Sequence, residues 1–156
     1  MNFIDTFHDS EVEKRKDRIY GVAVGIVTNN DDADGLGRVK VHFPWLSDEN
    51  ESAWARVAVV MAGNNRGAWF PPQIDDEVLV AFEHGDINKP IVIGAMWNGK
   101  DAPPSTDTES IVIQDKNGSF IKFEVSEGKI TIEAKEKLEI KAGKSMKLEA
   151  GEIDIN

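Results

Sequence analysis

The last third of the chain, residues 110–156, repeats a short strand pattern that leaves its own apolar side chains without cover. Four segments each place two apolar residues at positions i and i+2 with a polar residue between them, and this alternation predicts β-strands. The four pairs are Ile130 and Ile132, Leu138 and Ile140, Met146 and Leu148, and Ile153 and Ile155. Their first members are spaced by eight, eight and seven residues. A short, nearly fixed spacing predicts stacked β-layers rather than a compact sheet.

Two inward side chains per strand provide almost no core in one copy of this tail. Wound together with identical chains, the same residues would line the interior of a closed β-prism while lysine and glutamate side chains face water. We therefore predict that the tail joins several copies of the chain. The alternative is a terminal β-meander packed on the rest of the chain, which would carry bulkier apolar residues and longer turns.

The net negative charge lies almost entirely before the tail, because residues 110–156 carry nine acidic and eight basic side chains. The chain has 156 residues, with 28 acidic and 18 basic side chains and a net charge of −10. Binding to a phosphate backbone requires clustered Lys and Arg, so the charge argues against nucleic acid and favours protein partners or plain solubility. The chain has no cysteine, which excludes disulfides and thiolate metal sites. We expect stability to come from packing and oligomerisation.

Residues 1–18 are predicted to form a polar arm. Residues 1–20 lack the basic start, continuous apolar core and small-residue cleavage site of a signal peptide. No stretch of the chain approaches the roughly 20 apolar residues of a membrane span. We therefore expect synthesis and folding in the cytoplasm, without a signal peptide. Residues 9–18 fit either a short helix or an arm that becomes ordered in an assembly.

Residues 19–97 contain five strand patterns separated by turn-rich loops. They are rich in β-branched residues, are bounded by Gly, Asn, Asp and Pro, and cover residues 20–28, 37–43, 53–60, 77–82 and 90–96. Five short strands with no helix between them predict a small barrel, for which the five-stranded OB fold is the best-known solution. Residues 98–109, with two prolines and no apolar periodicity, are predicted to be a linker before the tail of residues 110–156.

The motifs that suggest metal binding or catalysis fail on spacing. Residues 30–35 resemble the start of a calcium loop, but the twelfth position, which needs a glutamate, is Val41. The Asp-Asp-Glu run at 75–77 is better explained as a turn than as paired catalytic carboxylates. The histidines are scattered without zinc-site spacing: His8, His42 and His84. We predict no enzyme, no cofactor and no metal site.

The tryptophans are candidate stacking platforms, because OB folds bind single strands by stacking bases on aromatic side chains in a basic groove. Few Lys or Arg residues accompany them. Trp54 and Trp97 lie in or at the end of apolar runs and are predicted to be core. Trp45 and Trp69 lie in loops, where they could pack between subunits or within one barrel.

Several short motifs occur in order between residues 20 and 100. They are GRVKV at 37–41, FPW at 43–45, WARV at 54–57, DEVLVAF at 76–82 and PIVIG at 90–94. In these motifs the chain resembles the OB-fold domain of VgrG and phage baseplate assembly protein V, the central spike family of contractile injection machines. Residues 111–115, 118–123 and 129–134 are similar to the start of that family's C-terminal β-helix, in which three chains intertwine.

The resemblance implies an all-β homotrimer, with a five-stranded OB-fold barrel followed by an intertwined β-helix, or β-prism. The expected trimer core comprises Ile111, Ile113, Ile121, Phe123, Ile130, Ile132, Leu138, Ile140, Met146, Leu148, Ile153 and Ile155. VgrG proteins have a large hub region before the OB domain, whereas only a short arm precedes residue 20 here. The linker also leaves no room for an inserted enzyme. The layout is therefore that of a minimal spike with a separate hub.

The implied function is a membrane-puncturing spike at the baseplate of a phage tail, tailocin, type VI or extracellular injection particle. The expected partners are a hub or tube protein, a PAAR-like tip protein and the target-cell membrane on firing. The hub would bind the arm through Phe3, Ile4, Phe7 and Val12, and the cap would bind a tip made of Ile153, Ile155 and Asn156. The alternative function is an OB-fold module that binds oligosaccharide or single-stranded nucleic acid, with the tail as an oligomerisation stalk.

Overall fold

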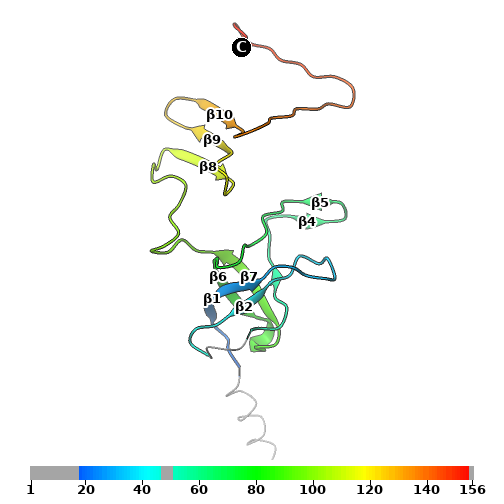
Figure 1. Cartoon of the computed structure of the whole chain (residues 1–156), viewed down its shortest axis with the longest axis vertical. Helices are drawn as coiled ribbons and strands as arrows, with labels where there is room; N and C mark the ends of the chain where they lie inside the picture. Colours follow the sequence, from blue (N-terminus) through cyan, green and yellow to red (C-terminus); the bar gives the residue numbers. More distant parts are fainter. Residues whose placement is uncertain (1–17, 47–50, 155–156) are drawn as a thin grey trace, which may run out of the picture. The chain divides into compact units, whose positions relative to one another are not determined.

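The computed structural model describes residues 18–46 and 51–154. The chain divides into two units, Met1–Ala102 and Pro103–Asn156, which can be followed by colour along the sequence in Figure 1. Across the described residues, the regular structure is β except for one 3-10 turn, η1 (Glu83–Gly85). The predicted all-β class is confirmed. No helix in this part of the chain is long and apolar enough to cross a membrane.

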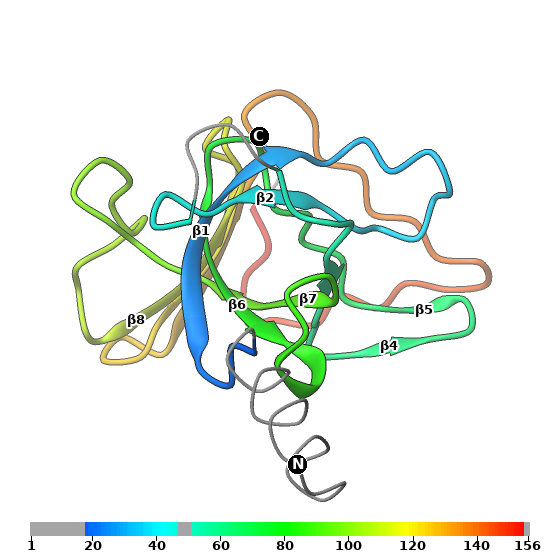
Figure 2. The ribbon, with the colours of Figure 1, turned by 90° about the horizontal axis from the view of Figure 1, so that it is seen from below.

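The first unit contains a curled five-stranded sheet (Figure 2). Its strands are β1 (Val22–Asn29), β2 (Lys40–His42), β3 (Arg56–Val57), β6 (Glu77–Phe82) and β7 (Pro90–Ala95). The strand order is β2-β1-β6-β7-β3, with β3 and β7 parallel and the other pairs antiparallel. The two edges meet where Val39 and Ala55 exchange backbone hydrogen bonds of 3.0 and 2.7 Å. This closure produces the predicted OB-like barrel.

The core of this unit is made mainly of valine. Alternation along β6 buries Val78, Val80 and Phe82, as expected for a strand with one face toward a core. The ring of Phe82 lies 5.6 Å from that of Phe43. The remaining buried apolar residues are Val27, Val39, Val41, Ala55 and Val92.

The structure differs from the sequence prediction after β3. The pattern at 53–60 predicts a strand through residue 60, but the ladder to β7 ends at Val57. The chain then forms a small hairpin, β4 (Ala62–Gly63) and β5 (Arg66–Gly67), which extends away from the five-stranded sheet (Figures 1 and 2). A tight connection through η1 joins β6 and β7, the last two strands of the barrel.

The second unit contains a three-stranded antiparallel meander. It consists of β8 (Ser110–Gln114), β9 (Phe120–Glu124) and β10 (Lys129–Glu133), in the order β10-β9-β8. Residues 134–154 form no strand. The described part of this single chain therefore contains no β-helix, and the intertwined tail is taken up again as a proposal below.

Candidate assembly surfaces

One face of the three-stranded sheet consists of apolar side chains. Directly paired residues on neighbouring strands project from the same face of a sheet. The register therefore places six of the predicted trimer-core residues together, in two rows that cross all three strands. The rows are Ile111, Phe123 and Ile130, and Ile113, Ile121 and Ile132. The sequence pattern predicts which residues lie on one side of each strand. The register shows that these sides of the three strands form one common face.

This apolar face is more exposed than the face behind it, which carries charged and polar side chains together with Val112 and Phe120. Ile130 and Ile132 are 62% and 54% exposed. On the other face, Glu124 is partly covered and forms ion pairs with Lys122 at 3.1 Å and Lys129 at 3.0 Å. Hydrogen bonds from Lys129 and Lys122 lower the pKa of Glu124. A sheet that folds alone would expose its polar face and cover its apolar one, so this surface is suited to contact another chain.

The segment after β10 continues the same alternation without a strand partner. Lys137 and Lys141 both form ion pairs with Glu139, and the hydrogen bonds from the two lysines lower the pKa of Glu139. Leu138 and Ile140, which alternate with these charges, are exposed. The next predicted core residues are exposed as well: Met146, Leu148 and Ile153. An extended chain that leaves its backbone groups unpaired can form a ladder with another chain.

The remaining predicted contact residues lie outside the described part of the chain. They are Phe3, Ile4, Phe7 and Val12 of the arm, and Ile155 and Asn156 of the tip.

The loop between β1 and β2 is held by the carboxylate of Asp32. Arg38 donates to it through Nε at 2.9 Å and through Nη2 at 2.7 Å, and the backbone N–H groups of Leu36 and Arg38 also donate to it. The Asp32 side chain is only 4% exposed. Its hydrogen bonds with Arg38 lower the pKa of Asp32 well below the usual range and raise that of Arg38. The segment that resembles a calcium loop is therefore an arginine-bound turn, and the described residues contain no metal-binding cluster.

The surface on which OB folds bind sugars and single strands is occupied by the protein's own ion pairs. That surface is formed by the second and third strands and their neighbouring loops. Here Arg38 and Lys40 lie over the ring of Trp54, at 5.7 and 5.5 Å from its centroid. Lys40 is paired with Glu51 at 2.9 Å, as Arg38 is with Asp32. The ring is therefore not a free stacking platform, and the two cations beside it are already neutralised.

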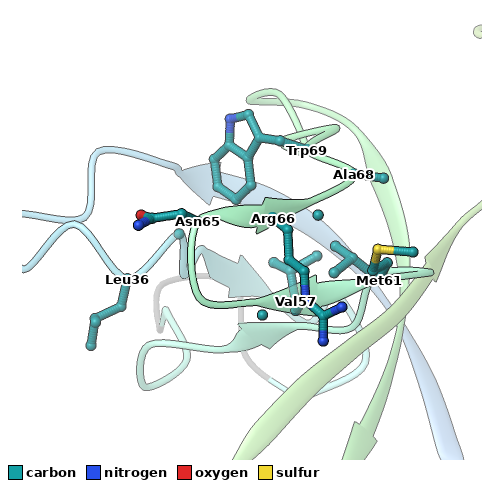
Figure 3. Close-up of a pocket in the computed structure, with 12 residues that line it drawn as sticks. Leu36, Val57, Met61, Asn65, Arg66, Ala68 and Trp69 are labelled. Carbon is teal, nitrogen blue, oxygen red and sulfur yellow. The ribbon is translucent and has the colours of Figure 1, made fainter.

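The β4–β5 hairpin borders a pocket of about 480 Å³. Figure 3 shows the side chains around it, which include Leu36, Val57, Met61, Arg66 and Trp69. Trp69 is anchored at its ring edge, because the indole lies against Gly37, where a larger residue would collide with the ring. The rest of the indole is exposed. No lining residue of this pocket is acidic.

A second, smaller pocket is lined by acidic side chains, in contrast to the first. Its volume is about 240 Å³, and it is lined by Asp76, Glu77 and Asp101 together with Trp97.

The prediction that Trp97 belongs to the core is wrong, since its side chain is 64% exposed. The physical reason is that β7 ends at Ala95, so Trp97 lies beyond the last strand of the barrel. Trp54, also predicted to be core, is only partly buried, because it covers the barrel surface beneath Arg38 and Lys40.

Residues 23–97, the strands and loops of the closed sheet, match the family model of the type VI secretion system/phage-baseplate injector OB domain. These residues therefore form an OB domain of the kind found in the VgrG and baseplate protein V family. The matched range covers all five strands of the barrel apart from the first residue of β1. It also contains both pockets except Asp101.

Three relatives in the VgrG family are spike proteins of type VI secretion systems. VgrG1a of Pseudomonas aeruginosa is 44% identical over 75 residues, covering 46% of this chain and 12% of that protein. VgrG3 of Vibrio cholerae is 41% identical over 75 residues, covering 46% and 7%. VgrG4b of Pseudomonas aeruginosa is 33% identical over 108 residues, covering 64% and 13%. The match thus spans about a tenth of each relative's length.

The hairpin and the acidic pocket were not predicted from the sequence. A signal for the hairpin was present, because Asn64 and Asn65 form a two-residue connection and Asn65 has a φ of +54°, a conformation that asparagine tolerates. The acidic pocket had a weaker signal in the run Asp75, Asp76 and Glu77. Asp101 joins that run in space only because β6 and β7 are paired.

Proposed function

We propose that this chain is the homotrimeric central spike protein of a contractile injection system, such as a phage tail, a tailocin, a type VI system or an extracellular injection particle. The uncovered apolar face of β8–β10 carries the proposal, and the spike-protein relatives of the OB unit support it. Three copies can turn this face toward a common axis, where each fully buried side chain contributes about 1.5–3 kcal/mol.

The rest of the tail extends the same interior. This segment continues the apolar alternation, and it forms no strand within the described single chain: Leu138, Ile140, Met146 and Leu148. Pairing this segment with strands of the other two copies satisfies the backbone and covers the side chains in one step. The tail then becomes an intertwined β-prism without a free lateral edge.

The proposed action is mechanical and needs no catalytic group. Contraction of a sheath drives the tube forward, and the rigid prism concentrates the force on a small tip that punctures the target-cell membrane. At the rear, the arm residues Phe3, Ile4, Phe7 and Val12 bind a baseplate hub or tube protein. At the front, Ile153, Ile155 and Asn156 of three copies form a platform for a PAAR-like cap.

The molar mass in solution tests this proposal. We expect light scattering of the full chain to give three times the chain mass of 17.3 kDa, with no folded monomer, because the apolar face cannot remain exposed. A folded monomer at micromolar concentration would overturn the proposal.

The alternative, an OB module that binds oligosaccharide or single-stranded nucleic acid, is less well supported by the geometry. The residues around Trp54 are already paired with carboxylates, and the chain carries a net charge of −10. We expect no binding when single-stranded DNA or a neutral oligosaccharide is titrated at low salt. Saturable binding that falls steeply with added salt would instead favour the nucleic-acid module.

A further inference from the structure

Residues 52–74, which contain the β4–β5 hairpin, differ in charge from the rest of the OB unit. In a chain with 28 acidic residues, this segment has none and carries two arginines, Arg56 and Arg66. It also exposes large apolar side chains: Val60, Met61, Trp69 and Phe70. The segment is therefore basic and apolar within an acidic OB unit, and its hairpin projects from the sheet (Figure 2).

Apart from the contact of Trp69 with Gly37, the described residues of the OB unit leave these side chains largely uncovered. The hairpin extends from the sheet in both ribbon views (Figures 1 and 2), and Val60 is 92% exposed. The Arg66 side chain lies across the hairpin over Gly63, where an added methyl group would be 2.7 Å from Nε. Arg66 forms no ion pair with any described residue. Two-stranded hairpins are marginally stable alone, so a partner surface would stabilise this one.

The acidic pocket supplies the complementary surface. Its three carboxylates accept hydrogen bonds from uncharged groups: the N–H of Gln73 donates to Asp76, and the Asn98 amide donates to Glu77 and Asp101. No cation is among the residues that line the pocket. Residues 75–102 as a whole carry six acidic and two basic side chains. The exposed ring of Trp97 offers a guanidinium a cation–π contact as well.

We propose that, in the trimer, the β4–β5 hairpin of each OB unit docks on the acidic pocket of the next copy. Arg66 pairs there with Asp76, Glu77 and Asp101, and the apolar side chains of the hairpin cover Trp97. A cyclic trimer requires two different surfaces that complement each other head to tail, and the hairpin and the pocket form such a pair. Opposite charges fix the register of the contact. This inference rests on the proposed trimer and adds a second interface to the tail.

Cysteine cross-linking of the full chain tests the contact directly, because the natural sequence contains no cysteine. We would combine Asn65→Cys, at the hairpin turn, with Lys100→Cys, beside the pocket, so that Arg66 and the three carboxylates stay unchanged. Mild oxidation is expected to give covalent trimers on a denaturing gel. The matched control, Asn65→Cys with Glu83→Cys, places the second thiol at the far end of β6 and should give none.

Charge reversal then tests the chemistry of the contact. In the cross-linking variant, adding Arg66→Glu should lower the yield of covalent trimer roughly tenfold, because like charges then face each other. Adding Asp101→Arg to that protein should restore most of the yield, while Asp101→Arg alone should lower it.

The molar mass of each uncross-linked protein separates the two proposals. A trimer that does not cross-link between residues 65 and 100 would overturn the hairpin contact and leave the trimeric spike standing. Cross-linking of Asn65→Cys alone, tip to tip, would overturn the head-to-tail arrangement. A monomeric wild-type chain would overturn the trimer and the hairpin contact together.

Discussion

Gly37 and Asp32 shape the loop between β1 and β2. Gly37 has a φ of +69° and lies against the indole of Trp69, so it fixes the base of the hairpin. Asp32 closes the loop by binding Arg38, which in turn lies over Trp54. Gly37 thus connects this loop to Trp69 at the base of the hairpin. Asp32 connects it, through Arg38, to the surface around Trp54. Each can be tested by a single substitution.

We expect Gly37→Ala to destabilise the OB unit by about 1–3 kcal/mol, because alanine is strained in the left-handed region and its methyl group would collide with Trp69. Gly35→Ala is the control, since Gly35 has a φ of +66° with no atom within 4 Å of an added methyl group. Chemical denaturation should show the larger loss for Gly37→Ala, together with altered tryptophan fluorescence. Equal losses would show that Trp69 does not pack on Gly37.

Stability should depend on the ionisation of Asp32. Its folded-state pKa lies below the value of about 3.9 for a free aspartate. The Arg38 pair therefore contributes stability above that pH, and the contribution falls as pH drops through the folded-state pKa. We expect Asp32→Asn to lower the urea midpoint at neutral pH, and we expect its difference from wild type to shrink progressively as the pH falls below about 4. Asp34→Asn, which removes a more exposed carboxylate, should have a smaller effect at neutral pH.

Among the elements of the chain, β10 shows most clearly why we propose that the second unit assembles with other copies. Ile130 and Ile132 point to the uncovered face, and Thr131 between them points to the face of Lys122 and Glu124. Neighbouring residues of one strand therefore occupy different environments in the proposed trimer. A charged side chain would be unfavourable in the interior, where Ile130 and Ile132 lie, and favourable or neutral on the outer face, where Thr131 lies.

We expect Ile132→Asp to abolish trimerisation through the tail, because three carboxylates would converge on the axis at several kcal/mol each when buried unpaired. Thr131→Asp, next to it and opposite Lys122, should leave the trimer intact. Light scattering measures the oligomer, and circular dichroism checks that the OB unit stays folded. A trimeric Ile132→Asp protein would show that this face does not point inward.

For the whole molecule, the sequence and the proposed function assign different contacts to the two ends of the chain. The arm carries Phe3, Ile4, Phe7 and Val12 among charged residues, a composition suited to ordering against another protein. The tip carries two isoleucines within its last four residues, Ile153 and Ile155. Neither end is required for the β8–β10 interface, so the ends should be separable from trimer formation.

Deleting residues 2–12 should leave the trimer intact but weaken capture of the hub protein at least tenfold. Deleting residues 151–156 should spare hub capture and weaken capture of the cap protein, because the platform of strand ends is lost. Pull-down with each truncated trimer measures both contacts. Normal hub binding by the arm deletion, with loss in the tip deletion, would contradict these assignments.

The sequence determined what depends on neighbouring residues. Alternation over residues 77–82 predicted β6 with the bounds Glu77–Phe82, and the pattern at 90–96 predicted β7 to within one residue of its end at Ala95. It also marked Ile130 and Ile132 as one side of a strand, which β10 confirms. These features follow from a two-residue period that is written locally in the chain. The motifs at 37–94 were enough to indicate the family.

Tertiary structure decided what depends on residues far apart in the chain. The parallel pairing of β3 with β7 leaves β3 only two residues long and directs the following segment into the hairpin. The pairing of β6 with β7 brings Asp101 to Asp76 and Glu77. Strand register assembles the apolar face from three separate segments. Periodicity tells which side chains share a side of one strand, whereas register and strand order, set by long-range packing, decide which strands meet.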